Sequence, residues 1–337
     1  MSGNTVTLTR GTTIERDLTV PAGVTLELTG DGGLWLLDNI TLTVNGTVNA
    51  PSNRIGFDDS GARTITINGN GTINLTSKGS LIGVGENRKL TLDGVTLVGI
   101  ADNDSPLVRT GERGELVLVS GAITGNSTNH SGAGVFVDTR GTFTMSGGAI
   151  FGNTTTGNGG GVFVGEGSVF TMSGGAISDN NTISARDAGG GGVRVERGTF
   201  TMSGGAISGN TVNTIVGAGG GGVRIGEDST FTMSGGAIYG NSVQTSTGGS
   251  GAGGVFISNR STFIMEGGRI QGGTDSDGFT RNISRMGSDG LQSAALEVSQ
   301  STARWGTGGT YTKGGVSQIG GGNIASTNDT LIAIPVR

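Results

Sequence analysis

The stretch Gly141-Thr142-Phe143-Thr144-Met145-Ser146-Gly147-Gly148-Ala149-Ile150 recurs along the chain and decides the fold. Near-copies begin at Ser168, Gly198, Ser229 and Ser261. Their phenylalanines lie 27, 30, 31 and 32 residues apart and are Phe143, Phe170, Phe200, Phe231 and Phe263. Self-similarity at a period of roughly 20 to 50 residues is typical of architectures in which each unit packs on its neighbours.

Each unit contains three short segments with strand character. In Phe-Thr-Met, the alternation places Phe and Met inward and Thr outward. Ala-Ile forms the second segment and ends at an Asn turn, and Val-x-Val or Val-x-Ile forms the third. Stacked coils pair equivalent residues, so a strand keeps its length while a loop can vary. The pattern therefore predicts an all-β fold, a single-stranded, right-handed parallel β-helix.

We expect one β-helix domain over residues 1–337, with about 11 coils of roughly 30 residues and a length of about 50 Å. Residues 1–113 alternate apolar residues with Thr but lack the Gly-Gly-Ala-Ile signature, which predicts irregular first coils. Residues 114–273 carry the regular Gly-rich repeats. Residues 274–337 predict degenerate coils and a cap, and the chain closes on the apolar strand Leu331-Ile332-Ala333-Ile334.

Stacking of like residues predicts two structural ladders inside this rod. The five repeat phenylalanines form the first ladder. The turn asparagines form the second and are Asn126, Asn153, Asn180, Asn210 and Asn241. A hydrophobic content of 33% with 4% aromatic residues suits the thin core of a solenoid better than that of a globule.

Composition also limits the classes of partner. The net charge of −5 carries mixed signs, and no basic patch indicates nucleic acid. No stretch is long and apolar enough to predict a membrane span. The absence of Cys excludes disulfides and thiolate metal sites. Residues Met1-Ser2-Gly3-Asn4-Thr5 carry no signal-peptide pattern, so the protein is either cytosolic or has lost its signal peptide.

From about Gly114 to Gly273, the repeats resemble the Gly-rich β-helix repeats of bacterial cell-surface proteins. The upstream stretch Thr19-Val20-Pro21-Ala22-Gly23-Val24-Thr25-Leu26 looks like the first coils of pectin-lyase-like solenoids. The Gly-Gly-Ala-Ile unit is also similar to that of chlamydial polymorphic membrane proteins, although the turn Phe151-Gly152-Asn153 departs from their Phe-x-x-Asn. The resemblance implies an extracellular or cell-surface location and an adhesin-like role.

Residues suited to catalysis are sparse. Pectin-lyase-like folds often host polysaccharide lyases and hydrolases, which need clustered carboxylates. The acidic candidates are Asp58-Asp59, Asp102-Asn103-Asp104 and Asp275-Ser276-Asp277-Gly278, and His130 is the single histidine. Each lies in a polar, turn-like stretch without a legible partner, so we expect no catalytic residue, no cofactor and no metal. A carbohydrate-binding or carbohydrate-active protein is the alternative interpretation.

Two outward columns are candidates for binding. The middle residue of the third strand gives a stripe of Phe136, Phe163, Arg194, Arg224 and Phe256. This stripe is either a ligand surface that uses stacking and cation–π contacts or a surface covered by the adjacent loops. Outward Thr-x-Thr pairs, such as Thr142 with Thr144, form a second column, interrupted at Val169 and Ile264. A flat Thr array gives ice binding as a further alternative.

The variable loops are the leading candidates for function. They are Thr154–Gly159, Asn181–Ala188, Thr211–Ala218 and Ser242–Ser250, and they leave successive coils on the same side. We therefore predict a non-catalytic secreted or surface-displayed structural or adhesive β-helix that binds a host-surface or glycan ligand. Strand edges at both ends of a solenoid invite pairing, so head-to-tail assembly of the protein with itself into filaments is also predicted.

Overall fold

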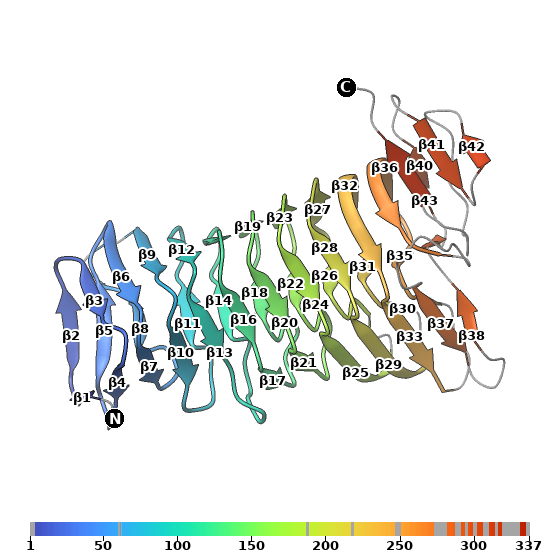
Figure 1. Cartoon of the computed structure of the whole chain (residues 1–337). Coiled ribbons are helices and arrows are strands. Elements are labelled where there is room, and N and C mark those ends of the chain that lie inside the picture. Colours follow the sequence, from blue (N-terminus) through green and yellow to red (C-terminus); the bar gives the residue numbers. More distant parts are fainter. Residues whose placement is uncertain are drawn as a thin grey trace.

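Side chains of the Phe-Thr-Met segments alternate between core and solvent, as the repeats predict. Phe143 and Met145 are fully buried, while Thr142 and Thr144 are half-buried on the outer side. Corresponding strands of successive coils pair in parallel, and the coils stack into an elongated rod (Figure 1). This computed structural model confirms the predicted parallel β-solenoid.

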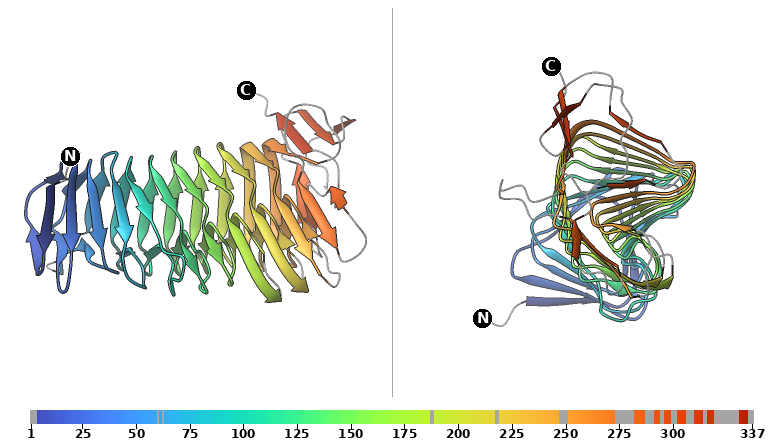
Figure 2. Two further views of the ribbon diagram at one scale, coloured as in Figure 1. Left: turned by 60° about the horizontal axis from the view of Figure 1, so that its bottom comes forward. Right: turned by 90° about the vertical axis from the view of Figure 1, so that its right-hand side faces the viewer.

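The structure describes residues 4–59, 61, 63–186, 189–216, 219–246, 251–272, 282–286, 291–293, 296–298, 302–305, 310–313, 316–318 and 331–334. These residues form strands, turns and bends and include no helix. Seen along the rod, successive coils superimpose (Figure 2, right).

A main sheet of 23 strands carries the first two segments of every coil. Its first-segment strands are β3 (Leu18–Val20), β6 (Ile40–Val44), β9 (Thr64–Asn68), β12 (Lys89–Asp93), β15 (Glu115–Leu118), β19 (Thr142–Met145), β23 (Val169–Met172), β27 (Thr199–Met202) and β40 (Thr302–Trp305). Its second-segment strands are β1 (Asn4–Leu8), β4 (Val24–Leu28), β7 (Thr47–Ala50), β10 (Thr72–Leu75), β13 (Thr96–Val98), β16 (Ala122–Thr124), β20 (Ala149–Phe151), β24 (Ala176–Ser178) and β28 (Ala206–Ser208). Both segments merge in β32 (Thr230–Tyr239) and β36 (Thr262–Ile270), and β41 (Thr310–Lys313), β42 (Val316–Gln318) and β43 (Leu331–Ile334) complete the sheet.

The third segment forms a second face. An eight-stranded sheet contains β11 (Ile82–Val84), β14 (Val108–Thr110), β18 (Val135–Val137), β22 (Val162–Val164), β26 (Val193–Val195), β31 (Val223–Ile225), β35 (Val255–Ile257) and β39 (Leu296–Val298). The eight strands of this sheet correspond to about eight turns of the solenoid, each of about 27 residues. A three-stranded sheet of β2 (Gly11–Ile14), β5 (Gly33–Leu36) and β8 (Ile55–Phe57) continues this face through the N-terminal coils.

Coils lengthen toward the C-terminal end. Lys89 pairs with Thr64, 25 residues earlier, whereas Thr262 pairs with Thr230, 32 residues earlier. The Phe-Thr-Met segments of successive coils stay paired residue for residue through this change. The added residues therefore enter the segment between the second and third strands, as the sequence predicts.

The phenylalanine ladder forms the centre of the core. Phe143, Phe170, Phe200, Phe231 and Phe263 are fully buried, and neighbouring rings stack with centroids 4.6 to 5.0 Å apart. Parallel-offset stacking adds to the free energy gained from burying each ring. Each of these five coils therefore presents the same aromatic ring to the next.

The asparagine ladder lies at the buried end of the second strand. Asn126, Asn153, Asn180, Asn210 and Asn241 are at most 1% exposed. From Asn153 to Asn210, each side-chain amide donates to Oδ1 of the next asparagine, whereas Asn126 donates to Oδ1 of Asn153 through its backbone N–H. Nδ2 of Asn180 donates to Oδ1 of Asn210 at 3.0 Å and to the carbonyl oxygen of Ile150 at 2.9 Å. The structure adds Asn103 and Asn282 at the two ends of this ladder.

The last strand differs in direction from the coils. Leu331–Ile334 forms β43, as its apolar sequence predicts, but β43 pairs antiparallel with β36 and with β41. It therefore lies against the final long strand of the main sheet without continuing the parallel stack.

Candidate ligand-binding surface

The variable segments, predicted as loops, are largely strands. They form a seven-stranded sheet of β17 (Ser127–Thr128), β21 (Thr154–Thr155), β25 (Asn181–Arg186), β29 (Thr211–Val216), β33 (Ser242–Thr245), β37 (Ile283–Met286) and β38 (Leu291–Ser293). The loop prediction for Thr154–Gly159, Asn181–Ala188, Thr211–Ala218 and Ser242–Ser250 is therefore corrected for the residues in these strands. Hydrogen bonding between equivalent segments of neighbouring coils accounts for the difference.

Glycine-rich return segments make room for this sheet. After β21, β25 and β29, the chain returns to the eight-stranded sheet through Gly runs such as Gly189 to Gly192, and β30 (Gly219–Gly220) pairs with β34 (Gly251–Ala252) there. A Cβ on Gly191 would lie 2.5 Å from the carbonyl oxygens of Thr211 and Gly221. The two backbones thus approach too closely for any side chain at this position.

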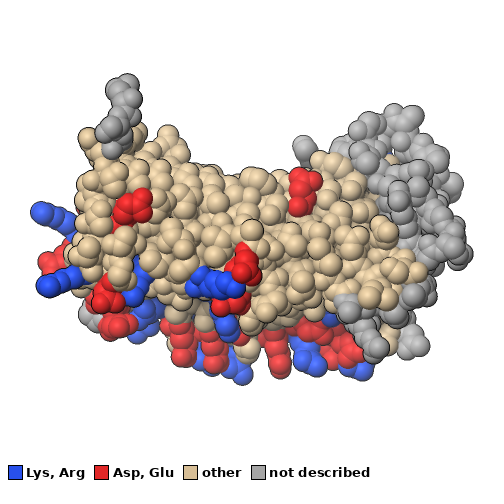
Figure 3. Space-filling model, turned by 90° about the horizontal axis from the view of Figure 1, so that it is seen from below, with Lys and Arg blue, Asp and Glu red and all other residues tan. Residues whose placement is uncertain are grey.

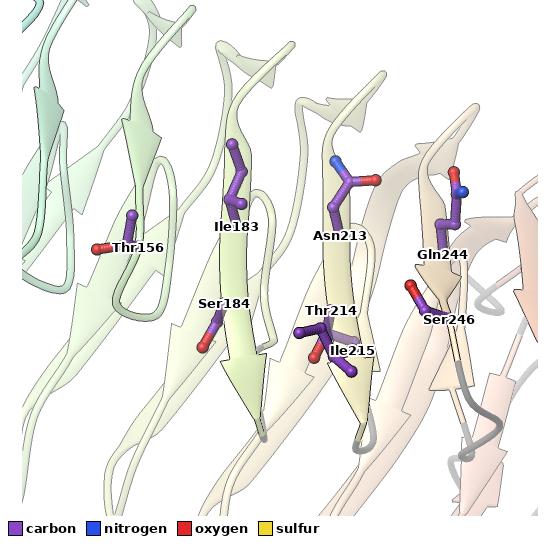
Figure 4. Close-up of a pocket in the computed structure, with 8 residues that line it drawn as sticks. All are labelled: Thr156, Ile183, Ser184, Asn213, Thr214, Ile215, Gln244 and Ser246. Atoms are coloured by element: carbon purple, nitrogen blue, oxygen red, sulfur yellow. The ribbon is translucent and has the colours of Figure 1, made fainter.

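The outer face of the seven-stranded sheet carries a groove of about 440 Å³ (Figure 4). It crosses four neighbouring strands and is lined by Thr156, Ile183, Ser184, Asn213, Thr214, Ile215, Gln244 and Ser246. Ile183 and Ile215 are 45% and 51% exposed, which is high for isoleucine. Inner positions of the same strands, such as Val212 and Val243, are buried, so the sheet is amphipathic and Ile183 and Ile215 lie on its exposed outer side.

Among the residues that the structure describes, the groove lining is uncharged. Its eight residues supply hydroxyl groups, two carboxamides and the aliphatic side chains of two isoleucines. Figure 3, which views the rod from the side where β21, β25 and β29 lie in Figure 1, shows charged side chains gathered mainly along one long edge. In the part of the chain that the structure describes, the groove is therefore a neutral amphipathic surface.

The predicted stripe of third-strand side chains forms one continuous column. Phe136, Phe163, Arg194, Arg224 and Phe256 pair in register from coil to coil. The rings of Phe136 and Phe163 stack with centroids 5.1 Å apart, and the Arg224 guanidinium lies 5.5 Å from the centroid of the Phe256 ring. The stacking and cation–π contacts predicted for a ligand are thus made within the column itself.

The side chains of this column become more buried toward the C-terminal end of the rod. Phe163 is half-buried, whereas Phe256 is only 3% exposed. Arg194 and Arg224 are 8% and 9% exposed. A Cβ on Gly189 would lie 2.1 Å from Cδ of Arg224, so the return segment lies directly on this side chain. The sequence left two possibilities open for the stripe, a ligand surface or a surface covered by adjacent segments. Arg194, Arg224 and Phe256 are covered.

Arg109 continues the column and was not among the predicted members. It pairs with Phe136, and its guanidinium lies 5.2 Å from the centroid of that ring. Nη2 of Arg109 donates to Oδ2 of Asp138 at 2.8 Å. Burial acts to raise the pKa of Asp138, but hydrogen bonds from Arg109 and from the backbone N–H of Thr139 outweigh it and lower the pKa below the ordinary value.

The acidic candidates lie apart from the groove and from one another. Oγ1 of Thr13 donates to Oδ2 of Asp58 at 3.0 Å, and Asp102 forms an exposed ion pair with Lys78 at 2.8 Å. His130 is exposed in the turn after β17. Asp59 and Asp104 are also exposed, and Asp275-Ser276-Asp277-Gly278 lies outside the described residues. Within the described part of the chain, no three His, Asp or Glu side chains are placed to hold a metal ion.

The Thr-x-Thr pairs lie on the outer face of the main sheet. Thr144 pairs with Thr171, which pairs with Thr201 in the next coil. The neighbouring column is interrupted at Val169, which is 38% exposed. Connections between the two strands of this face are Ser-Gly-Gly turns in each coil from β19 to β28, so no long loop interrupts it there.

Comparisons with models of protein families, with curated proteins and with solved structures found no match. Among the residues that the structure describes, no helix has the length and apolar character needed to cross a membrane. The class of this protein is therefore defined by its own architecture, a parallel β-solenoid with an amphipathic sheet attached along one side.

Proposed function

We propose that this protein is a non-catalytic, secreted or surface-displayed adhesive β-solenoid that binds its ligand through the groove of the seven-stranded sheet. The observation that carries this proposal is the exposure of Ile183 and Ile215 beside polar, uncharged neighbours. Exposed apolar side chains that are rimmed by polar groups are typical of interaction surfaces. Their place on the segments that vary from coil to coil agrees with the tendency of binding residues to lie on connections outside a regular scaffold.

The scaffold supports such a role because it holds the groove rigidly. Strands β25, β29 and β33 pair in register, so the side chains that line the groove have fixed spacings. Elsewhere in the same coils, the buried asparagine and phenylalanine ladders repeat the same contacts from coil to coil. A preorganised surface loses less conformational entropy when a ligand binds.

A cell-binding assay with matched variants tests this proposal. Fluorescently labelled protein is incubated with intact bacterial and epithelial cells over a concentration series. The double variant Ile183→Glu/Ile215→Glu places two charges in the groove and should weaken binding at least tenfold. The control Val119→Glu/Val169→Glu makes the same chemical change at two valines that are each 38% exposed outside the groove.

The control variant should bind as the wild type does, and both variants should keep the far-ultraviolet circular dichroism of the wild type. Equal binding by the groove variant and the wild type, or no binding to any cell by the wild type, would refute the proposed function.

A further inference from the structure

We infer that the ligand of this groove is a neutral oligosaccharide or a neutral stretch of polysaccharide that lies across the strands, along the rod. The inference rests on the proposed function and adds the chemical class of the ligand. Three properties of the groove support it: its lack of charge, its hydrogen-bonding groups and its periodicity.

The lack of charge excludes two classes of ligand. None of the eight lining residues is Lys, Arg, Asp or Glu. Recognition of sulfated, phosphorylated or uronic-acid polymers relies on Arg and Lys, which form charge-assisted hydrogen bonds with anionic groups. A cationic ligand would in turn require carboxylates. A neutral ligand is the class that these residues can bind without leaving a charge unpaired.

The hydrogen-bonding groups match those of a sugar. Asn213 and Gln244 are exposed, and a carboxamide offers both a donor and an acceptor, as a sugar hydroxyl does. The Gln244 amide lies on the exposed lining of the groove, where a ligand can reach it. Ile183 and Ile215 flank these amides, and their methyl groups can pack against the C–H face of a sugar ring.

The periodicity of the groove matches that of a polymer. Ile183, Asn213 and Gln244 pair in register on consecutive strands, and Thr156 follows the residue that pairs with Thr182. Consecutive strands lie about 4.8 Å apart, so these four positions span about 14 Å. A pyranose residue is about as long as one strand spacing, so the groove offers one side chain to each of three or four sugars.

An extended peptide fits this surface less well. A peptide that adds to a sheet binds the backbone groups of a free edge strand. Strands β25 and β29 each pair with a neighbour on both sides, so the backbone beneath the groove is already hydrogen-bonded. A ligand on this face must be recognised by side chains alone, and side-chain amides beside aliphatic groups favour a sugar over a peptide.

Isothermal titration calorimetry with defined sugars tests the ligand class. The probes are hexaoses of glucose, xylose, mannose and N-acetylglucosamine, with hexagalacturonate as the acidic comparison. We expect at least one neutral hexaose to bind and hexagalacturonate not to bind. The variant Asn213→Asp/Gln244→Glu keeps the side-chain shapes but removes the amide donors, and it should weaken binding of the neutral hexaose at least tenfold. The exposed Asn87→Asp variant, in a turn far from the groove, should bind as the wild type does.

Treatment of the target cells separates this inference from the proposed function and does not depend on the choice of hexaoses. Periodate cleaves the vicinal diols of sugars, so it should abolish groove-dependent binding of the labelled protein to cells, while protease treatment should leave that binding intact. Binding that survives periodate but is lost after protease would identify a protein ligand, which overturns the inference and leaves the proposed function standing. A preference for hexagalacturonate would overturn it as well. If the Ile183→Glu/Ile215→Glu variant bound untreated cells as well as the wild type does, the proposed function itself would be refuted.

Discussion

Replacing one amide of the asparagine ladder by a carboxylate should destabilise the solenoid far more than the small change in the side chain suggests. The Asn210 side chain is fully buried, and its Nδ2 donates to the carbonyl oxygens of Ile177 at 2.9 Å and Ser208 at 3.1 Å. The same Nδ2 also donates to Oδ1 of Asn241 at 2.9 Å. Asn210→Asp leaves the shape of the side chain nearly unchanged. It replaces the donating amide group with a carboxylate oxygen, which can only accept and which faces three other oxygen atoms.

The magnitude follows from these contacts. Each buried carbonyl that loses its partner costs about 1–3 kcal/mol, and an unpaired buried charge costs about 3–5 kcal/mol. We therefore expect Asn210→Asp to lower the free energy of unfolding by at least about 3 kcal/mol at pH 7. Burial raises the pKa of the new carboxyl above its ordinary value, and the neutral acid regains one donor. The loss in free energy of unfolding should therefore become smaller as the pH falls toward about 4.

Urea unfolding followed by far-ultraviolet circular dichroism at pH 4 and pH 7 measures both effects. Because repeat arrays can unfold in parts, amide hydrogen exchange over residues 206–241 should accompany it. Asn213→Asp is the matched control, since this amide is exposed and donates to Asn181 at 3.3 Å. It should change stability by about 0.5 kcal/mol or less. A deficit of Asn210→Asp that equals the control, or that does not depend on pH, would refute this account of the ladder.

Three further predictions concern the core, the stripe and the return segment. Phe200→Ala should lower the free energy of unfolding by about 3–5 kcal/mol, and Phe163→Ala on the half-buried stripe by less than half as much, measured by urea unfolding. The lowered pKa of Asp138 stabilises the fold above the ordinary carboxyl pKa, and this contribution is lost as the pH falls through the lowered value. Asp138→Asn, which gives up the ion pair with Arg109, should therefore flatten the loss of thermal stability below about pH 4. Gly191→Ala should cost about 1–3 kcal/mol and also weaken cell binding, because the added methyl group pushes the seven-stranded sheet away; unchanged stability would contradict the close approach.

The repeats predict the core well because its chemistry repeats without variation. Phe143 and its equivalents occur at the same place in each unit, so stacking follows from the register alone. The turn asparagines follow the same logic, and the structure extends their ladder to Asn103 and Asn282. Those two lie in stretches without the Gly-Gly-Ala-Ile signature, so the repeat alignment did not include them.

The seven-stranded sheet was harder to predict because its inner side does not face the main core. Thr155 and Thr182 occupy fully buried positions where an ordinary strand would carry aliphatic residues. These positions face the glycine-rich return segments, and Oγ1 of Thr182 donates to the carbonyl oxygen of Gly190 at 3.3 Å. A Ser/Thr/Asn-rich strand therefore looks like a loop in sequence. The β-branched residues Thr211, Val212, Thr214 and Ile215 are the signal that favours a strand in this segment.

The stripe and the groove depend on the same added residues. Arg194 and Arg224 belong to the coils that lengthen, and the lengthened segments supply both the return glycines over the stripe and the strands that form the groove. Nε of Arg194 donates to Oε2 of Glu196 at 2.9 Å, so its charge is paired while its stem packs beneath the return segment. Shorter coils upstream leave Arg109 exposed and lack the long strands β25 and β29. The covered arginines thus support the sheet that carries the groove, in agreement with the proposal that the ligand binds on the variable segments and not on the stripe.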